Sequence, residues 1–136
     1  GVDISERQIS RARWNVPNAT FVHADMASVD FPPAAFDGVV AFFSIVHVPR
    51  DEHSSLLRAV ACWLRPGGVF VATLGAGGAE TDYEEDWMVA SMYWSGFDSD
   101  TNMRLVEQAG LSIISAEETT DDPDDRFIWI VAEMPV

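Results

Sequence analysis

The sequence of 136 residues contains no lysine, and its eight basic residues, all arginine, face 22 acidic residues, for a formal net charge of −14. This charge would repel a phosphate backbone or an anionic lipid surface, which argues against nucleic-acid and membrane partners. A single cysteine, Cys62, excludes an intrachain disulfide scaffold and favours a cytoplasmic location. No apolar run reaches the ~20 residues of a transmembrane helix.

The length and the 48% hydrophobic content fit a single domain over residues 1–136, which needs no metal or disulfide to hold a core. Strand-like and helix-like patterns alternate along the chain. The predicted strands are 1–4, 20–25, 38–43, 69–74, 111–117 and 126–133, and the predicted helices are 5–14, 51–64 and 101–109. This alternation indicates an α/β three-layer domain, in which one of the last two strands runs antiparallel because no helix joins them.

Two helix starts carry capping signals. Ser5 followed by Gln8 forms a capping box for the first helix. Asp100 is the expected cap of the third helix, and Gly110 is expected to close it.

Acidic and aromatic residues follow three of the predicted strands: Asp3 the first, Asp25 the second, and Phe43 the third. In open α/β sheets, ligands bind beyond the carboxyl ends of the strands. One carboxylate there can accept hydrogen bonds from both hydroxyls of a ribose, and the next can accept one from an exocyclic amine. The pattern therefore predicts an adenosine pocket.

Four sequence blocks, at residues 1–5, 22–26, 36–40 and 64–70, match in order and spacing the class I S-adenosylmethionine-dependent methyltransferases. They are GVDIS, VHADM, FDGVV and LRPGGVF, and the resemblance covers residues 1–133. It implies a Rossmann-like methyltransferase sheet, mostly parallel with a C-terminal antiparallel strand, and S-adenosylmethionine as cofactor.

The resemblance also implies roles for single residues. Asp3 matches the acid that binds the cofactor ribose, and Ile4 the apolar residue that packs on the adenine. Asp25 matches the acid that contacts the adenine amine, with Met26 beside the ring. The segment that flanks the methionine part of the cofactor and the substrate is matched by Phe42, Phe43 and Ser44.

One part of the family pattern is absent: its first strand and glycine-rich loop should precede Gly1. In the family that strand is central, between the strands that here end in Asp3 and Phe43. Its absence would leave a gap of about 4.8 Å or two unpaired edges. The chain is therefore expected to be a fragment of a longer protein, or to receive another segment, such as a strand swapped within a homodimer.

Of the three histidines, His47 is the predicted catalytic residue. His47 lies just past the third strand, where the methyl acceptor is expected, and histidine accepts protons near neutral pH. Its alternative role is structural, capping the following turn. His23 is expected to be a packed core residue, and His53, in the first turn of a helix, to be solvated.

The stretch 83–97 holds many aromatic and thioether side chains for a connecting segment. We expect a lid over an apolar or aromatic acceptor, with core packing as the alternative. The expected substrate-binding residues are Tyr83, Trp87, Met92, Tyr93 and Trp94.

Other patterns indicate ordinary structure. Glycines at 75, 77 and 78 imitate a dinucleotide-binding loop, but the third glycine at the required spacing is missing and acidic residues follow. The acidic run 121–125 lacks the EF-hand pattern and is interpreted as a solvated turn. Cys62 is expected to face the core, and with three scattered histidines it forms no zinc motif, so no metal site is predicted.

The leading hypothesis is methyl transfer from S-adenosylmethionine to a small-molecule acceptor. The alternative is a non-catalytic methyltransferase-like remnant that serves as a binding or dimerisation module, which unfilled sheet edges would favour. A nicotinamide-dependent oxidoreductase is the remaining class, and the incomplete glycine pattern disfavours it.

Overall fold

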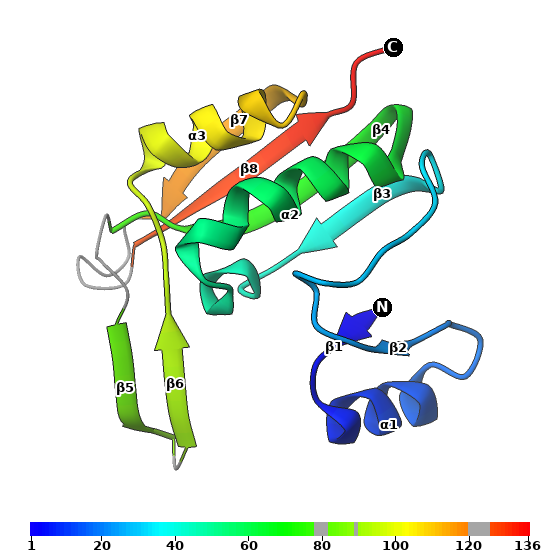
Figure 1. Cartoon of the computed structure of the whole chain (residues 1–136), viewed down its shortest axis with the longest axis vertical. Helices are drawn as coiled ribbons and strands as arrows, with labels where there is room; N and C mark the ends of the chain where they lie inside the picture. Colours follow the sequence, from blue (N-terminus) through cyan, green and yellow to red (C-terminus); the bar gives the residue numbers. More distant parts are fainter. Residues whose placement is uncertain (78–81, 89, 120–125) are drawn as a thin grey trace. The chain divides into compact units, whose positions relative to one another are not determined.

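A computed structural model describes residues 1–77, 82–88, 90–119 and 126–136 (Figure 1). The chain divides into two compact units, an N-terminal unit, Gly1–Phe31, and a C-terminal unit, Pro32–Val136. Each unit is described by itself.

The N-terminal unit is a β-α-β element. Strand β1 (Val2–Asp3) leads into helix α1 (Glu6–Asn15), and strand β2 (Val22–His23) returns parallel to β1. The predicted capping of α1 is confirmed, because the Ser5 hydroxyl accepts a hydrogen bond of 3.3 Å from the Gln8 amide. Ile9 is the buried side chain of α1.

The C-terminal unit is built on a four-stranded sheet of order β3-β4-β8-β7. These strands are β3 (Phe36–Ala41), β4 (Leu64–Gly75), β7 (Ser112–Thr119) and β8 (Phe127–Glu133). Strand β3 runs parallel to β4, whereas β8 runs antiparallel to both β4 and β7. The predicted mostly parallel sheet with an antiparallel C-terminal strand is therefore confirmed.

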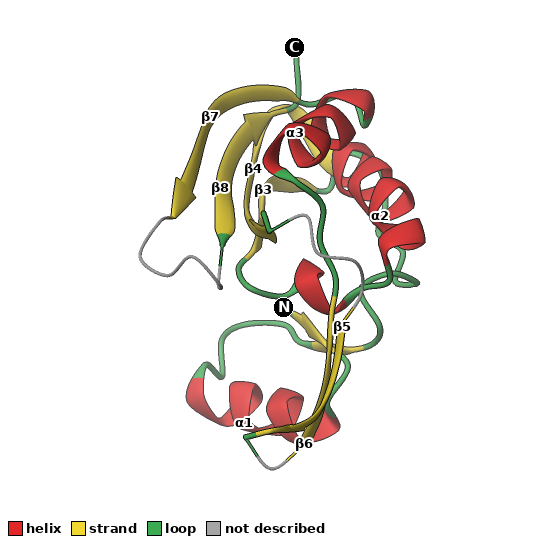
Figure 2. Cartoon of the chain, turned by 90° about the vertical axis from the view of Figure 1, so that its left-hand side faces the viewer, coloured by secondary structure: helices red, strands yellow, loops and turns green. Residues whose placement is uncertain are grey.

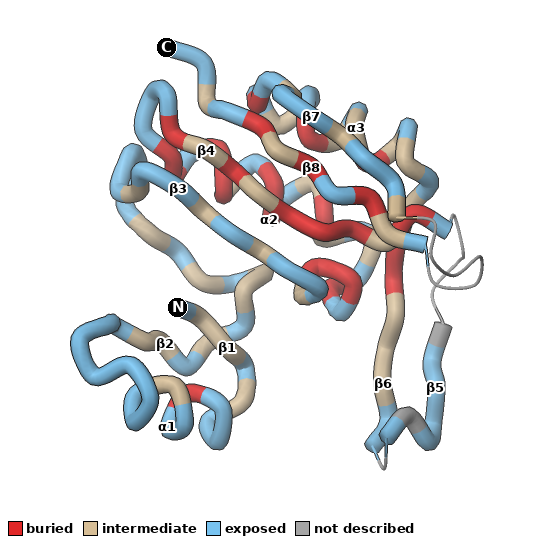
Figure 3. The backbone as a smooth tube through the Cα atoms, turned by 180° about the vertical axis from the view of Figure 1, so that it is seen from behind, coloured by how far each residue is buried: buried red, intermediate tan, exposed pale blue. Residues whose placement is uncertain are grey.

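Two helices cover one face of this sheet, α2 (Arg50–Trp63) and α3 (Ser99–Gln108) (Figure 2). Apolar residues of α2 at helical spacing, including Leu57 and Val60, are buried, and so are alternate residues of β8, such as Ile130. Buried positions therefore concentrate in β4, β8 and α2, where the core of this unit lies (Figure 3).

The connecting stretch after β4 is a hairpin of β5 (Asp82–Trp87) and β6 (Ala90–Trp94), which reaches away from the four-stranded sheet (Figure 1). A short 3-10 helix, η1 (Ile45–His47), follows β3. Among the described residues no helix is both long and apolar enough to cross a membrane.

Two unpaired strand edges match the expectation for an absent first strand. Strand β3 is an edge strand of its sheet, and β1 pairs with β2 alone among the described residues. The unpaired edges thus occur on the two strands where the family resemblance predicts them.

The cap of α3 was predicted wrongly. The helix begins at Ser99, and Asp98, not Asp100, caps it, because the Asp98 carboxylate accepts the Thr101 amide at 2.7 Å. Asp98 also holds the extended backbone that a cap requires, with φ −64° and ψ 162°. Gly110 follows this helix at φ 97°, which agrees with its predicted closing role.

Three predictions about burial were also wrong. His53 is buried at 3% exposure, because α2 begins at Arg50 and turns its first-turn histidine inward. His23 is exposed, since the second strand ends with it instead of continuing. Cys62 is exposed as well, on the side of α2 away from Ala61 and Trp63, which are buried.

Candidate functional site

The two acids predicted to hold adenosine follow neighbouring strands. Asp3 ends β1 and pairs in register with His23, and Asp25 comes two residues later. Because β1 and β2 are parallel, both carboxylates lie at the same edge of this strand pair. The structure thus brings together the two acids that the sequence singled out.

Each carboxylate is oriented by its own turn. Asp3 Oδ1 accepts the Ser5 amide at 2.7 Å, and Asp25 Oδ1 accepts the Ala27 amide at 2.9 Å. These bonds use one oxygen of each carboxylate, and Oδ2 can accept from a ligand. Asp3 is half-buried and Asp25 is exposed.

The residues beside these acids differ in exposure. Ile4, which follows β1, is 71% exposed, and Met26 is half-buried. The His23 ring donates from Nε2 to the Ile4 carbonyl at 2.9 Å, so it ties the ends of β1 and β2 together. Sequence reasoning missed this role because it assigned His23 to the core.

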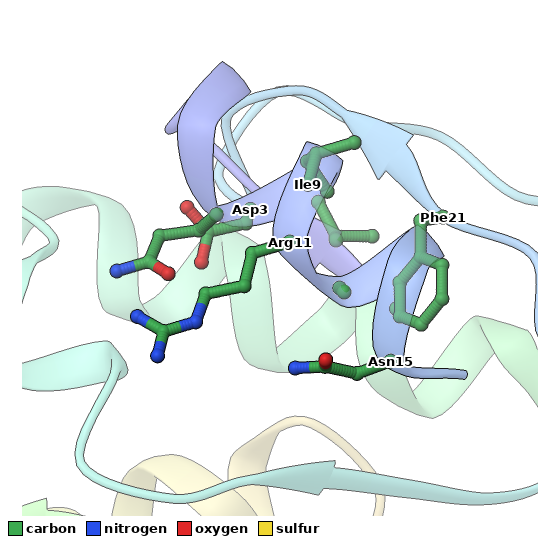
Figure 4. A pocket seen from close by; sticks show the side chains of 9 residues that line it. Asp3, Ile9, Arg11, Asn15 and Phe21 are labelled. Atoms are coloured by element: carbon green, nitrogen blue, oxygen red, sulfur yellow. The ribbon is translucent and has the colours of Figure 1, made fainter. Parts of the chain in front are cut away.

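A pocket of about 370 Å³ runs along β1 and α1, and Asp3 is one of its lining residues (Figure 4). Its lining combines the apolar Ile9 and Phe21 with the polar Arg11 and Asn15. Asp25 and Met26 do not line it. This pocket was not predicted from the sequence, because the spacing of Ile9, Arg11 and Asn15 indicates a helix and nothing more.

In the C-terminal unit, the end of β3 carries a cluster of aromatic rings. Phe42 lies 5.5 Å from Trp129, and Phe43 lies 5.1 Å from Phe127 and 5.8 Å from Trp129, as ring-centroid distances. Phe127 and Trp129 begin β8, which runs antiparallel to β4, so the start of β8 meets the carboxyl ends of β3 and β4. Phe127 and Trp129 were not identified as site residues from the sequence. Their alternation with Ile128, which is buried, was a signal that both point to the opposite face of β8.

Phe43 has an unusual backbone. Its φ is 48°, in the left-handed region that bulky residues rarely adopt. Its amide donates to the Thr73 hydroxyl at 2.6 Å, and Thr73 is fully buried in β4. Ser44 follows half-buried, and its side chain makes no capping bond to η1.

His47, the catalytic candidate, contacts the hairpin. Its Nδ1 lies 2.9 Å from the Tyr93 carbonyl oxygen, and its ring lies 4.8 Å from the Trp94 ring. A carbonyl can only accept, so Nδ1 carries the proton and Nε2 of the neutral ring keeps its lone pair. The imidazole is exposed. Two predicted substrate-binding residues thus orient the predicted base.

The other hairpin candidates lie further from His47 along the strands. Tyr83 pairs in register with Tyr93 and is exposed, and Met92 is half-buried. Trp87 ends β5 and its side chain is outside the described part. The described side chains of this hairpin are exposed or half-buried, so they do not form a packed core, and the lid stays a prediction.

A buried hydrogen-bond group anchors the base of the hairpin. His53 Nε2 lies 2.9 Å from the Val48 carbonyl oxygen and 3.1 Å from the Ser95 hydroxyl. The Ser95 amide donates to the Val46 carbonyl at 2.7 Å, which ties the hairpin to η1. Burial lowers the pKa of His53 below its ordinary value of 6.5 and so disfavours the charged ring.

The glycine and acidic patterns of the sequence do not mark a further site in the described residues. Gly75 lies where two backbone segments approach closely, since a Cβ on Gly75 would lie 3.3 Å from the Ser95 carbonyl oxygen. Gly78 lies outside the described residues, as does the acidic run 121–125. No three His, Cys, Asp or Glu side chains gather around a metal position in the described ranges.

Comparison with known proteins supports the family. Residues 1–68 match the methyltransferase domain family. The 27-O-demethylrifamycin SV methyltransferase of Amycolatopsis mediterranei is 31% identical over 131 residues, which covers 88% of this chain and 47% of that protein. The chain spans about half the length of the curated relatives it matches.

Solved structures share the fold. A putative S-adenosylmethionine-dependent methyltransferase from Listeria monocytogenes has a TM-score of 0.84 at 13% identity, covering 100% of this chain and 79% of its own. A 1,6-didemethyltoxoflavin N1-methyltransferase from Burkholderia thailandensis was solved with 1,6-didemethyltoxoflavin and S-adenosylhomocysteine bound. It has a TM-score of 0.73 at 16% identity, and the match covers 99% of this chain and 60% of that protein's chain. Because the family model covers residues 1–68, half of the chain, this chain belongs to the methyltransferase domain family, and its fold is that of solved S-adenosylmethionine-dependent methyltransferases.

Proposed function

We propose that this chain binds S-adenosylmethionine at the carboxyl ends of β1, β2 and β3 and takes part in methyl transfer to a small-molecule acceptor. The observation that carries the proposal is the pair of carboxylates, Asp3 and Asp25, at the ends of adjacent parallel strands. The proposal treats residues 1–136 as a single methyltransferase-like domain.

The residues present fit the cofactor. Asp3 is fixed through Oδ1 by the Ser5 amide, so its Oδ2 can accept from ribose hydroxyls. Asp25 is fixed in the same way by Ala27 and is assigned to the adenine amine. The exposed Ile4 offers an apolar surface for the adenine ring, and half-buried Met26 lies next to Asp25.

The proton chemistry is assigned to His47. Its Nδ1–H is held by the Tyr93 carbonyl, so Nε2 is the proton-accepting atom. When bound, S-adenosylmethionine supplies an activated methyl group together with its own leaving group. His47 would take the proton that an acceptor hydroxyl or amine loses on methylation. Trp94, packed on the imidazole, limits the ring's freedom to turn.

The acceptor is assigned to the class of small apolar or aromatic molecules. The relatives' names support it, since one methylates a demethylrifamycin and another a demethylated toxoflavin. Exposed aromatic faces at the strand end, on Phe42 and Phe43, and along the hairpin, on Tyr83, suit a planar acceptor. The net charge of −14 disfavours a nucleic-acid acceptor.

The test is a calorimetric titration with S-adenosylhomocysteine. Asp3→Asn keeps an oxygen for the Ser5 amide and removes the charge, so we expect at least tenfold weaker binding, or about 1.4 kcal/mol. Asp30→Asn removes the same charge from an exposed position and should bind like the parent. Equal affinities of the two variants would contradict the ribose assignment.

The unpaired edges of β1 and β3 favour one alternative, a non-catalytic module that pairs with a second copy. It predicts a dimer by sedimentation and no binding of S-adenosylhomocysteine. A monomer that binds the ligand would exclude it.

A further inference from the structure

Thr73 is a buried polar residue for which the proposed function gives no role. It lies in the C-terminal half of β4 with no exposed surface. It pairs in register with Trp129 of β8, so it lies beside the aromatic cluster at the strand end. A buried hydroxyl requires a partner, and its partner is the Phe43 amide at 2.6 Å.

Phe43 needs such a restraint. Its φ of 48° is unfavourable for a residue with a Cβ, and a bulky side chain makes it rarer still. Strain of this kind persists only where surrounding contacts hold it, and it gathers at functional sites. The Thr73 hydroxyl holds the backbone, while Phe127 and Trp129 hold the ring by edge contacts.

The restraint acts where the chain leaves the sheet. Strand β3 ends at Ala41, and the chain turns through Phe43 and Ser44 into η1, which carries His47. Phe43 remains 49% exposed despite its two aromatic contacts, so about half of the residue is accessible to a ligand. A change in φ at Phe43 would redirect both this ring and the start of η1.

We propose that Thr73 is a positioning residue: its hydroxyl holds Phe43 in the left-handed conformation and so places the Phe42–Ser44 segment for cofactor and acceptor. The inference rests on the proposed function, because that function assigns this segment to the site. Thr73 itself touches neither the reacting atoms nor the cofactor.

Two substitutions at Thr73 test the inference, one that keeps the size of the side chain and one that keeps its hydroxyl. Thr73→Val keeps the shape and removes the hydroxyl, whereas Thr73→Ser keeps the hydroxyl and removes a methyl group. We expect amide hydrogen exchange at Phe43 to accelerate at least tenfold in T73V and to stay within threefold in T73S. The Ala72 amide, in the ladder of β4, should not change in either variant.

The second readout is affinity for S-adenosylhomocysteine. We expect T73V to bind at least tenfold more weakly and T73S within threefold of the parent. Glycine adopts positive φ without strain, so in a Phe43→Gly background the valine substitution should change affinity by less than threefold. If T73V does not fold, this background provides the comparison.

Two failures are distinguishable. A parent chain that does not bind S-adenosylhomocysteine overturns the proposed function, and with it the site role of Thr73. A parent that binds, together with T73V and T73S variants of equal affinity or equal Phe43 exchange, overturns the positioning role alone.

Discussion

Replacing Asn102 should destabilise the C-terminal unit strongly. Asn102 is 1% exposed on α3, and its side-chain amide donates to two backbone carbonyls, Gly75 at 2.8 Å and Phe97 at 3.2 Å. These bonds tie α3 to the end of β4 and to the segment after the hairpin. Asn102→Leu retains the approximate size and leaves both carbonyls without this donor.

The expected magnitude follows from these two bonds. A buried acceptor left without a partner costs about 1–3 kcal/mol, and both carbonyls belong to half-buried residues, so we expect about 2–4 kcal/mol in total. A chain of 136 residues has an unfolding entropy of roughly 0.3 kcal/mol/K, which converts this loss to a Tm decrease of roughly 7–14 °C.

Thermal unfolding followed by circular dichroism measures this change. The matched control is Gln108→Leu, an exposed position on the same helix, where a change within about 0.5 kcal/mol is expected. If N102L unfolds at the same temperature as Q108L, the two bonds do not stabilise the fold and the reasoning fails.

Two further predictions concern α3 and the buried histidine. Asp98→Ala should cost about 1 kcal/mol in the free energy of unfolding by removing the helix cap, whereas Asp100→Ala should cost less than half as much; the reverse order in thermal melts would favour Asp100 as the cap. Burial, the largest cause, lowers the pKa of His53, and nearby Arg50 lowers it further, so the native state binds fewer protons than the unfolded state below pH 6.5. The resulting contribution to stability is present above pH 6.5 and is lost as the pH falls through the native pKa. Urea unfolding at pH 7.5 and 5.5 should therefore show a smaller pH dependence in His53→Gln than in the parent, and equal pH dependence would refute the assignment.

The parts of the fold that local signals determine were predictable. Ser5 and Gln8 marked the start of α1, since a cap is set by residues three apart in sequence. Apolar runs located β3 and β4, and the turn without a helix predicted the antiparallel pairing of β8. The adjacency of Asp3 and Asp25 followed from the parallel pairing of β1 and β2.

Features that depend on tertiary contacts were not predictable. The cap of α3 was predicted at Asp100, but the extended backbone that a cap requires lies two residues earlier, at Asp98. The burial of His53 depends on Ser95, which is distant in sequence and returns beside it. The left-handed Phe43 depends on Thr73 in the same way, thirty residues away along the chain.

The most direct test of the central claim is a nuclear magnetic resonance titration of the isotopically labelled chain with S-adenosylhomocysteine. If the residues at the ends of β1, β2 and β3 bind the cofactor, the amide signals of Asp3, Asp25 and Phe43 should each shift along a saturable curve. No saturable shift at any of the three amides would contradict the claim.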